Sequence, residues 1–169
     1  MRLVSCTEER HGTAILAIFN EAIVNSTAIY DYEPRAPETM APWFAIKRNG
    51  GLPILGVEDT GGNLRGFASY GTFRAWPAYK YTVEHSIYIE AGHRGAGLGR
   101  RLLEALIARA VQLGVHTMVG AIDVNNASSI ALHRHLGFEH AGTIRHAAFK
   151  FSRWLDLAFY QLILDTPTH

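Results

Sequence analysis

The chain is poor in cysteine and in clustered charge, and both shortages limit what it can do. Its 169 residues include one cysteine, Cys6, so no internal disulfide can form, which favours a reducing compartment. Lysine and arginine number 16 against 15 acidic residues, and no stretch gathers five or six like charges. Nucleic-acid binding needs a clustered basic face that neutralises phosphates. The sequence therefore argues against nucleic acid as a main partner.

Long apolar runs and metal-binding patterns are lacking too. No apolar stretch approaches the roughly 20 residues that span a bilayer, and residues 1–4 carry no signal-peptide run. The nine histidines form neither a His-Glu-x-x-His motif nor a Cys or His pair at zinc spacing. No Ser-His-Asp or Cys-His arrangement stands out. We expect a cytoplasmic protein that needs no membrane and no metal.

The composition is that of an ordinary globular protein, with 48% apolar and 18% charged residues. The length fits one compact domain, so we predict a single domain over residues 1–169. Hydrophobic periodicity and glycine positions predict an α/β fold (α+β, with a mixed sheet) in the order β-α-α-β-β-β-α-β-α-β-β. Its sheet would contain one strand-helix-strand crossover near the middle. The predicted helices are 7–23, 38–48, 97–113 and 126–136, and the strands after the first are 53–58, 64–73, 82–89, 117–122, 138–151 and 155–164.

A glycine-rich turn between a strand and a helix is the most informative segment. It reads Ile-Tyr-Ile-Glu-Ala-Gly-His-Arg-Gly-Ala-Gly-Leu-Gly-Arg-Arg over residues 87–101. Glycine lets the backbone approach a ligand, and the first N–H groups of a helix attract anions, so a diphosphate fits here. Alternatives are a plain turn with solvated arginines, or a dinucleotide site with Asp123 as the ribose-binding acid. The dinucleotide fingerprint is the weaker reading, because its third glycine position falls on Leu102.

Two motifs carry a resemblance to a known superfamily. Arg94-x-x-Gly97-x-Gly99 resembles the R/Q-x-x-G-x-G/A cofactor loop of the GCN5-related N-acetyltransferase (GNAT) superfamily. The second signature matches Asn126-x-x-Ser129-x-x-Leu132-His133-x-x-Leu136-Gly137-Phe138. The chain is also similar, along nearly its whole length, to phosphinothricin and methionine sulfoximine acetyltransferases. The supporting segments are 70–74, 82–89 and 150–156.

The resemblance implies the GNAT acyl-CoA N-acyltransferase fold and one N-acetyltransferase domain. It implies acetyl transfer from acetyl-CoA, as co-substrate, to the α-amine of a small amino acid. The favoured acceptors are phosphinothricin, L-methionine sulfoximine and L-methionine sulfone, which the enzyme would detoxify, and a homodimer is expected. Alternatives are an acetyltransferase for protein N-termini or other amines, and a non-catalytic acyl-CoA-binding module.

Acetyl transfer to an amine needs a general base, and a carboxylate in a partly dry cleft can reach the required pKa. The resemblance implies that Glu84 is this base, acting through a water; without the family, Glu84 also fits a surface carboxylate. Strand alternation puts Glu84 and Ser86 on one face and His85 on the other. His133 takes the place of a tyrosine that many GNAT enzymes use as general acid. Whether His133 is an acid or a base stays open.

The remaining expected roles concern the two ligands. Asn126 is expected to bind the cofactor, although its position also fits a plain helix N-cap. The residues expected to bind the cofactor are Ile87, Tyr88, Ile89, Arg94, Gly95, Ala96, Gly97, Leu98, Gly99, Arg100, Asn126, Ser129 and His135. The acceptor is expected to meet Arg74, which would anchor a carboxylate, together with Ala75, Trp76, Glu84, His85 and Ser86. Three residues would either line this pocket or pack against other side chains: Tyr30, Glu33 and Trp43. Lys150 and Trp154, expected between the last strands, would complete a neighbouring subunit's site.

Overall fold

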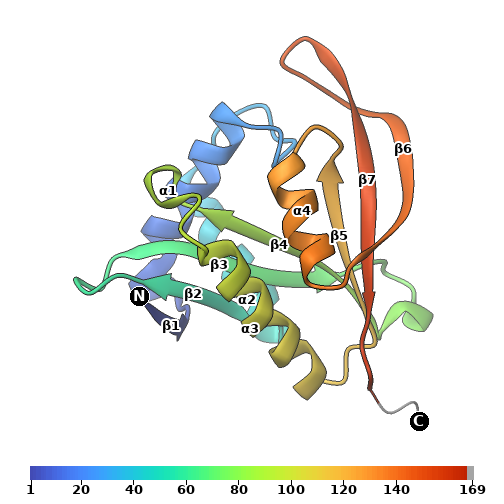
Figure 1. Cartoon of the computed structure of the whole chain (residues 1–169). Coiled ribbons are helices and arrows are strands. Elements are labelled where there is room, and N and C mark those ends of the chain that lie inside the picture. Colours follow the sequence, from blue (N-terminus) through green and yellow to red (C-terminus); the bar gives the residue numbers. More distant parts are fainter. Residues whose placement is uncertain (167–169) are drawn as a thin grey trace. The chain divides into compact units, whose positions relative to one another are not determined.

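The computed structural model describes residues 1–166, which contain seven strands and four α-helices (Figure 1). The elements follow the predicted order, so the predicted fold class is confirmed. Their bounds are β1 Arg2–Ser5, α1 Glu8–Asn25, α2 Met40–Asn49, β2 Ile54–Glu58, β3 Leu64–Thr72, β4 Thr82–Ile89, α3 Leu98–Gln112, β5 Thr117–Asp123, α4 Ala127–His135, β6 Glu139–Lys150 and β7 Arg153–Ile163. No helix within residues 1–166 combines the length and apolar character that crossing a membrane requires.

The chain divides into two compact units. The first contains Met1–Tyr70 and Ser86–Leu106, and the second contains Gly71–His85 and the chain from Ile107 onward. Strand β4 therefore begins in the second unit and ends in the first. A single domain over residues 1–169 stays a prediction.

Antiparallel strands form the sheet of the first unit. β1 pairs with β2, and β2 pairs with β3, with Leu3 opposite Val57 and Val57 opposite Gly66. The link between β2 and β3 is a hairpin turn. The Asp59 carboxylate accepts from the Asn63 backbone N–H at 2.9 Å, which fixes the turn.

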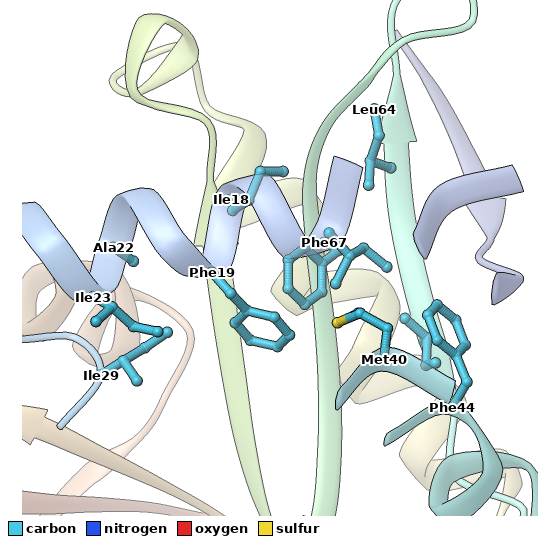
Figure 2. Close-up of a cluster of buried hydrophobic side chains, with 11 residues drawn as sticks. Ile18, Phe19, Ala22, Ile23, Ile29, Met40, Phe44, Leu64 and Phe67 are labelled. Atoms are coloured by element: carbon cyan, nitrogen blue, oxygen red, sulfur yellow. The ribbon is translucent and has the colours of Figure 1, made fainter. Parts of the chain in front are cut away.

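Helices α1 and α2 supply the core of the first unit. Figure 2 shows Phe19 of α1 and Met40 and Phe44 of α2 beside Phe67 of β3. The Phe19 and Phe67 rings meet edge to face with centroids 5.1 Å apart. Because α1 repeats apolar residues at helical spacing, one face is buried and the other faces solvent. The helix begins at Glu8 rather than Thr7, since Thr7 is its N-cap.

The second unit contains the parallel pair of strands that the predicted crossover connects. The first half of β4 pairs in parallel with β5, with Glu84 opposite Val119 and His85 opposite Gly120. β5 then pairs antiparallel with β7, and β7 with β6. The chain connects the parallel strands through α3, as parallel pairing requires.

The C-terminal hairpin corrects one expectation. Its turn is formed by Phe151 and Ser152, both with positive φ (51° and 58°), a geometry that suits a two-residue hairpin turn. Lys150 is therefore the last residue of β6, and Trp154 lies within β7, opposite Phe149. Lys150 thus lies within the predicted strand 138–151, whereas Trp154 lies in β7 and not between the strands as expected. A tight turn needs fewer residues than the periodicity suggested.

Candidate active site

The glycine turn lies in the first unit, between the end of β4 and the start of α3. Gly95 and Gly97 both have φ of +78°, a left-handed conformation that other residues rarely adopt. No heavy atom would lie within 4 Å of a Cβ at either position, so the backbone there faces open space. The turn leads directly into the first N–H groups of α3, the positive end of a helix dipole. This geometry suits an anionic ligand.

The arginines around the turn already have partners within the protein. Arg94 forms an ion pair with Glu21 of α1, and its Nε donates to the Ile89 carbonyl at 3.2 Å. Arg100 pairs with Glu104 at 2.8 Å, and Arg101 donates to the Met1 carbonyl. These contacts brace the turn against α1 and β4. Direct binding of the cofactor by Arg94 or Arg100 stays a prediction.

In the second half of β4, the Tyr88 side chain packs against the core of the first unit. The Tyr88 ring packs 5.3 Å from Phe19 and 5.5 Å from Phe67, centroid to centroid. A Cβ at Gly66 would lie 2.6 Å from a methyl group of Ile89, so β3 and β4 approach closely here. Ile87 and Ser86 are half-buried. Binding of the cofactor or the acceptor at these positions stays a prediction.

The aromatic residues of the early segment have different environments. The Trp43 ring packs on Phe44, with centroids 4.9 Å apart, and on Phe19, with centroids 5.5 Å apart. Of the two roles expected for Trp43, lining a pocket or packing, the structure shows packing. Tyr30 and Glu33 are exposed in the loop between α1 and α2. Their expected place at an acceptor pocket stays a prediction.

In the second unit, the structure brings Glu84 and Arg74 close enough to interact. Glu84 is on β4, and Arg74 is in the exposed loop that precedes this strand and also carries Ala75 and Trp76. Partial burial raises the pKa of the Glu84 carboxyl, while the positive charge of Arg74 opposes this rise. Arg74 lies 5.3 Å from the Phe73 ring centroid, and Trp76 is 67% exposed. The site thus places a carboxylate with a raised pKa near a guanidinium group, and the roles expected for Glu84 and Arg74 stay predictions.

Helix α4 begins as the sequence suggested. The Asn126 side chain accepts from the Ser129 backbone N–H at 3.1 Å, so Asn126 is an N-cap. Its amide N–H groups remain the part that could donate to a ligand. His135 is exposed in the last turn of α4. Asp123 accepts from the Asn125 backbone and is buried, so it does not present the ribose-binding acid of a dinucleotide site.

Two buried histidines form a contact that the sequence analysis did not anticipate. Nε2 of His85 lies 3.0 Å from Nε2 of His133, and the two ring planes are within 18° of parallel, with centroids 5.0 Å apart. The side chains are 7% and 3% exposed. Burial lowers the pKa of His85 to about 3, with a further contribution from His133, and burial also lowers the pKa of His133. Both rings are therefore neutral near pH 7.

The pairing separates the expected catalytic residues. His133 contacts His85, whereas Glu84 lies on the opposite face of β4 by strand alternation. We expected His85 to bind the acceptor, a role that stays a prediction beside this contact. One sequence signal could have revealed the pair: Gly120 interrupts the otherwise apolar run of β5. A Cβ there would lie 2.9 Å from Nε2 of His85 and 3.0 Å from Nε2 of His133.

Other expected residues lie apart from these groups. Lys150 is 4% exposed, with its ammonium 5.0 Å from the Phe151 ring centroid, and Trp154 is exposed. Within residues 1–166, no three His, Cys, Asp or Glu side chains are arranged to hold a metal ion.

Comparison with known proteins identifies the family. Residues 15–138 match the model of the acetyltransferase (GNAT) family. The chain belongs to this family. The resemblance found in the sequence, the fold class and the acetyltransferase class are thereby confirmed.

Three relatives of this GNAT chain illustrate the match. L-methionine sulfoximine/L-methionine sulfone acetyltransferase of Pseudomonas aeruginosa is 49% identical over 154 residues, which are 91% of this chain and 89% of the relative. A solved structure from Acinetobacter baylyi is 60% identical, with a TM-score of 0.98 over 99% of this chain and 94% of that chain. A phosphinothricin acetyltransferase of Sinorhizobium meliloti, solved with acetyl-CoA, is 37% identical, with a TM-score of 0.93 over 96% and 88%.

Proposed function

We propose that the chain transfers acetyl from acetyl-CoA to the α-amine of a small amino acid, with methionine sulfone and methionine sulfoximine as favoured acceptors. The observation that carries this proposal is the Glu84 and Arg74 pair, a candidate base beside a candidate carboxylate anchor. The 49% identity to an acetyltransferase named for these two compounds supports the choice of acceptor. The lower identity, 37%, of the phosphinothricin enzyme makes phosphinothricin a weaker candidate.

Glu84 has the properties of a general base for the amine. An α-ammonium must lose a proton before it can attack a thioester. Partial burial raises the pKa of Glu84 toward working pH, while the positive charge of Arg74 opposes this rise. In this role Glu84 accepts the proton through a water, and Arg74 binds the acceptor's carboxylate in a two-point fork.

The glycine turn suits the coenzyme's diphosphate. The open space at Gly95 and Gly97 and the start of α3 together form a site for an anion, so the residues present fit this group. The backbone of Ile87, Tyr88 and Ile89 would hold the peptide-like arm and polarise the thioester carbonyl. Ala96, Leu98, Gly99, Asn126, Ser129 and His135 complete the proposed cofactor contacts.

The acetyl group passes directly to the amine in this mechanism, without an acyl-enzyme. Such an intermediate needs a reactive nucleophile, and burial raises the pKa of Cys6 to about 12. A thiol with this pKa is almost never ionised near neutral pH. Direct attack in a ternary complex therefore fits the chain better.

A homodimer in the cytoplasm is part of the same proposal. The hairpin of β6 and β7 exposes large apolar side chains, Ile144, Phe149, Phe151 and Trp154, which suit a second copy of the chain. Sedimentation at several protein concentrations would test the dimer. A monomer throughout would contradict it.

The experiment is an acceptor panel in which released CoA is measured as free thiol. It compares methionine sulfone, methionine sulfoximine, phosphinothricin, a peptide with a free N-terminus, and the amine made by removing the carboxylate of methionine sulfone. We expect the sulfone and the sulfoximine to react best. Reaction of the peptide alone would favour a protein acetyltransferase, and binding of acetyl-CoA without transfer to any amine would favour a non-catalytic module.

Arg74→Gln sharpens the panel, because it removes the proposed anchor. We expect KM for methionine sulfone to rise about 10- to 100-fold, while the carboxylate-free amine is little affected. Arg109→Gln is the matched control, since Arg109 is exposed on α3 and donates to the neighbouring Gln112 side chain. Equal effects on both amines would remove Arg74 from acceptor binding.

A further inference from the structure

The His85 and His133 pair has a hydrogen-bonding direction that the protein sets itself. Nδ1 of His133 lies 2.6 Å from the Ser129 carbonyl, one turn earlier in α4. A carbonyl oxygen only accepts, so Nδ1 of His133 must carry a proton. In a neutral ring the other nitrogen, Nε2, is then an acceptor.

The position of the proton on His133 determines the position of the proton on His85. Because Nε2 of His133 accepts, Nε2 of His85 must donate across the 3.0 Å between them. The proton of the neutral His85 ring is therefore on Nε2, and its Nδ1 carries only a lone pair. Among residues 1–166, Nδ1 of His85 has no hydrogen-bond partner although it is buried. A buried acceptor without a partner is costly, and such groups are rare in native proteins.

Packing keeps the two rings in this arrangement. Phe138 meets both rings edge to face, with centroids 5.5 Å from His85 and 5.0 Å from His133. Gly120 lies opposite His85 in the parallel register, and a Cβ there would reach both Nε2 atoms. The titratable group that faces His85 is His133, which is also neutral. The pair thus has a fixed location and one buried nitrogen that lacks a hydrogen-bond partner among residues 1–166.

We propose that His85 and His133 form a neutral pair of fixed direction, in which Nδ1 of His85 accepts a hydrogen bond from an N–H or S–H group of the bound reactants. His133 is then a positioning residue, since both of its nitrogens are engaged within the protein. The identity of the reactants rests on the proposed function. The direction of the pair does not, because it follows from the protein's own contacts.

Nitrogen-15 NMR of the unliganded protein tests the direction. Long-range proton–nitrogen spectra at pH 7 distinguish a protonated ring nitrogen from a bare one. We expect the proton of His133 on Nδ1 and that of His85 on Nε2. The opposite tautomer on either ring, or a doubly protonated ring, would overturn the proposal, whatever reaction the protein catalyses.

Adding ligands one at a time tests the acceptor role and finds the source of the donor. The ligands are acetyl-CoA, CoA and methionine sulfone. If the His85 Nδ1 signal shifts with both acetyl-CoA and CoA, the donor is an amide N–H of the coenzyme. If it shifts with CoA alone, the donor is the thiol. If it shifts with methionine sulfone alone, the donor is the amine. Exposed His140, which bonds to Thr143, serves as the control signal. No shift of Nδ1 with any ligand, alone or combined, would overturn the acceptor role.

Two variants distinguish hydrogen bonding from proton transfer. His85→Gln keeps one donor and one acceptor but cannot be protonated near neutral pH, whereas His85→Leu keeps neither. We expect His85→Leu to lower kcat about 10- to 100-fold and His85→Gln to recover most of that loss. Equal losses in both variants would mean that His85 transfers a proton, and wild-type kcat in His85→Leu would mean that it does nothing; either result overturns the proposal. His140→Gln is the control.

Discussion

On the two faces of β4, the pKa values of two neighbouring titratable residues shift in opposite directions. Glu84 lies on one face, partly exposed and near the positive charge of Arg74, and its pKa is raised. His85 lies on the other, buried against His133 and Phe138, and its pKa is lowered to about 3. Loss of water is the first cause in both cases, and it favours the neutral form of each side chain.

The two pKa shifts have opposite consequences for proton exchange near working pH. For a carboxyl group, a raised pKa moves the proton exchange toward working pH. For an imidazole, a lowered pKa moves it away. The same physical effect therefore favours the proposed role of Glu84 as a proton acceptor and the proposed role of the His85 and His133 pair in hydrogen bonding. The predictions below test this contrast, beginning with the largest effect.

Replacing Glu84 by Gln removes the base from its face of β4. We expect kcat to fall about 10²- to 10⁴-fold, the typical contribution of a general base, with affinity for acetyl-CoA nearly unchanged. Steady-state kinetics and a binding titration measure the two quantities. Glu139→Gln, at an exposed carboxylate at the start of β6, is the control. Equal turnover in the Glu84 variant would end its role as base and would erase the contrast between the faces.

Replacing Gly120 by Ala disturbs the other face. The new Cβ would lie within 3.0 Å of Nε2 in both histidines, so the rings must move apart. Overpacking of this kind costs about 1–3 kcal/mol, and the broken buried hydrogen bond adds to it, so we expect a loss of about 3 kcal/mol. Denaturant unfolding measures the change. Gly92→Ala, where a Cβ meets nothing within 4 Å, should cost far less.

Acidification should destabilise the protein through His85. Below its ordinary pKa of 6.5 the unfolded chain binds a proton that the folded state excludes until about pH 3, so stability falls as the pH drops through this window. Between pH 7 and pH 5 the expected loss from His85 is about 2 kcal/mol. Unfolding curves at the two pH values measure it, and His85→Gln should flatten the dependence. An unchanged slope in that variant would show that folding does not lower the pKa of His85.

Local patterns predicted much of this protein. The hairpin at Asp59–Asn63, the N-cap at Asn126 and the two helices after the glycine turn depend on neighbouring residues, so the sequence specifies them directly. Thr7 and the turn at Phe151 show the usual limit, an uncertainty of one or two residues at the ends of elements.

Long-range contacts were beyond such patterns. Glu58 is fully buried because Arg2 and His11, far away in the chain, both bond to its carboxylate. Arg94 braces the glycine turn through Glu21, 73 residues earlier, where the motif suggested a free cation. Neither partner could be chosen from the many charged residues in the sequence. Each choice depends on which surfaces the fold brings together.

The sequence alone determined the family, through its two motifs. It also determined the glycine turn, because the positive φ at Gly95 and Gly97 is a local backbone property that few other residues allow. It also placed Glu84 and His85 on opposite faces of one strand, since alternation is built into extended backbone. Only the tertiary structure decided that His85 meets His133. That contact joins residues 48 positions apart, and it exists because β4 and α4 pack around a glycine in β5 that leaves room for both rings.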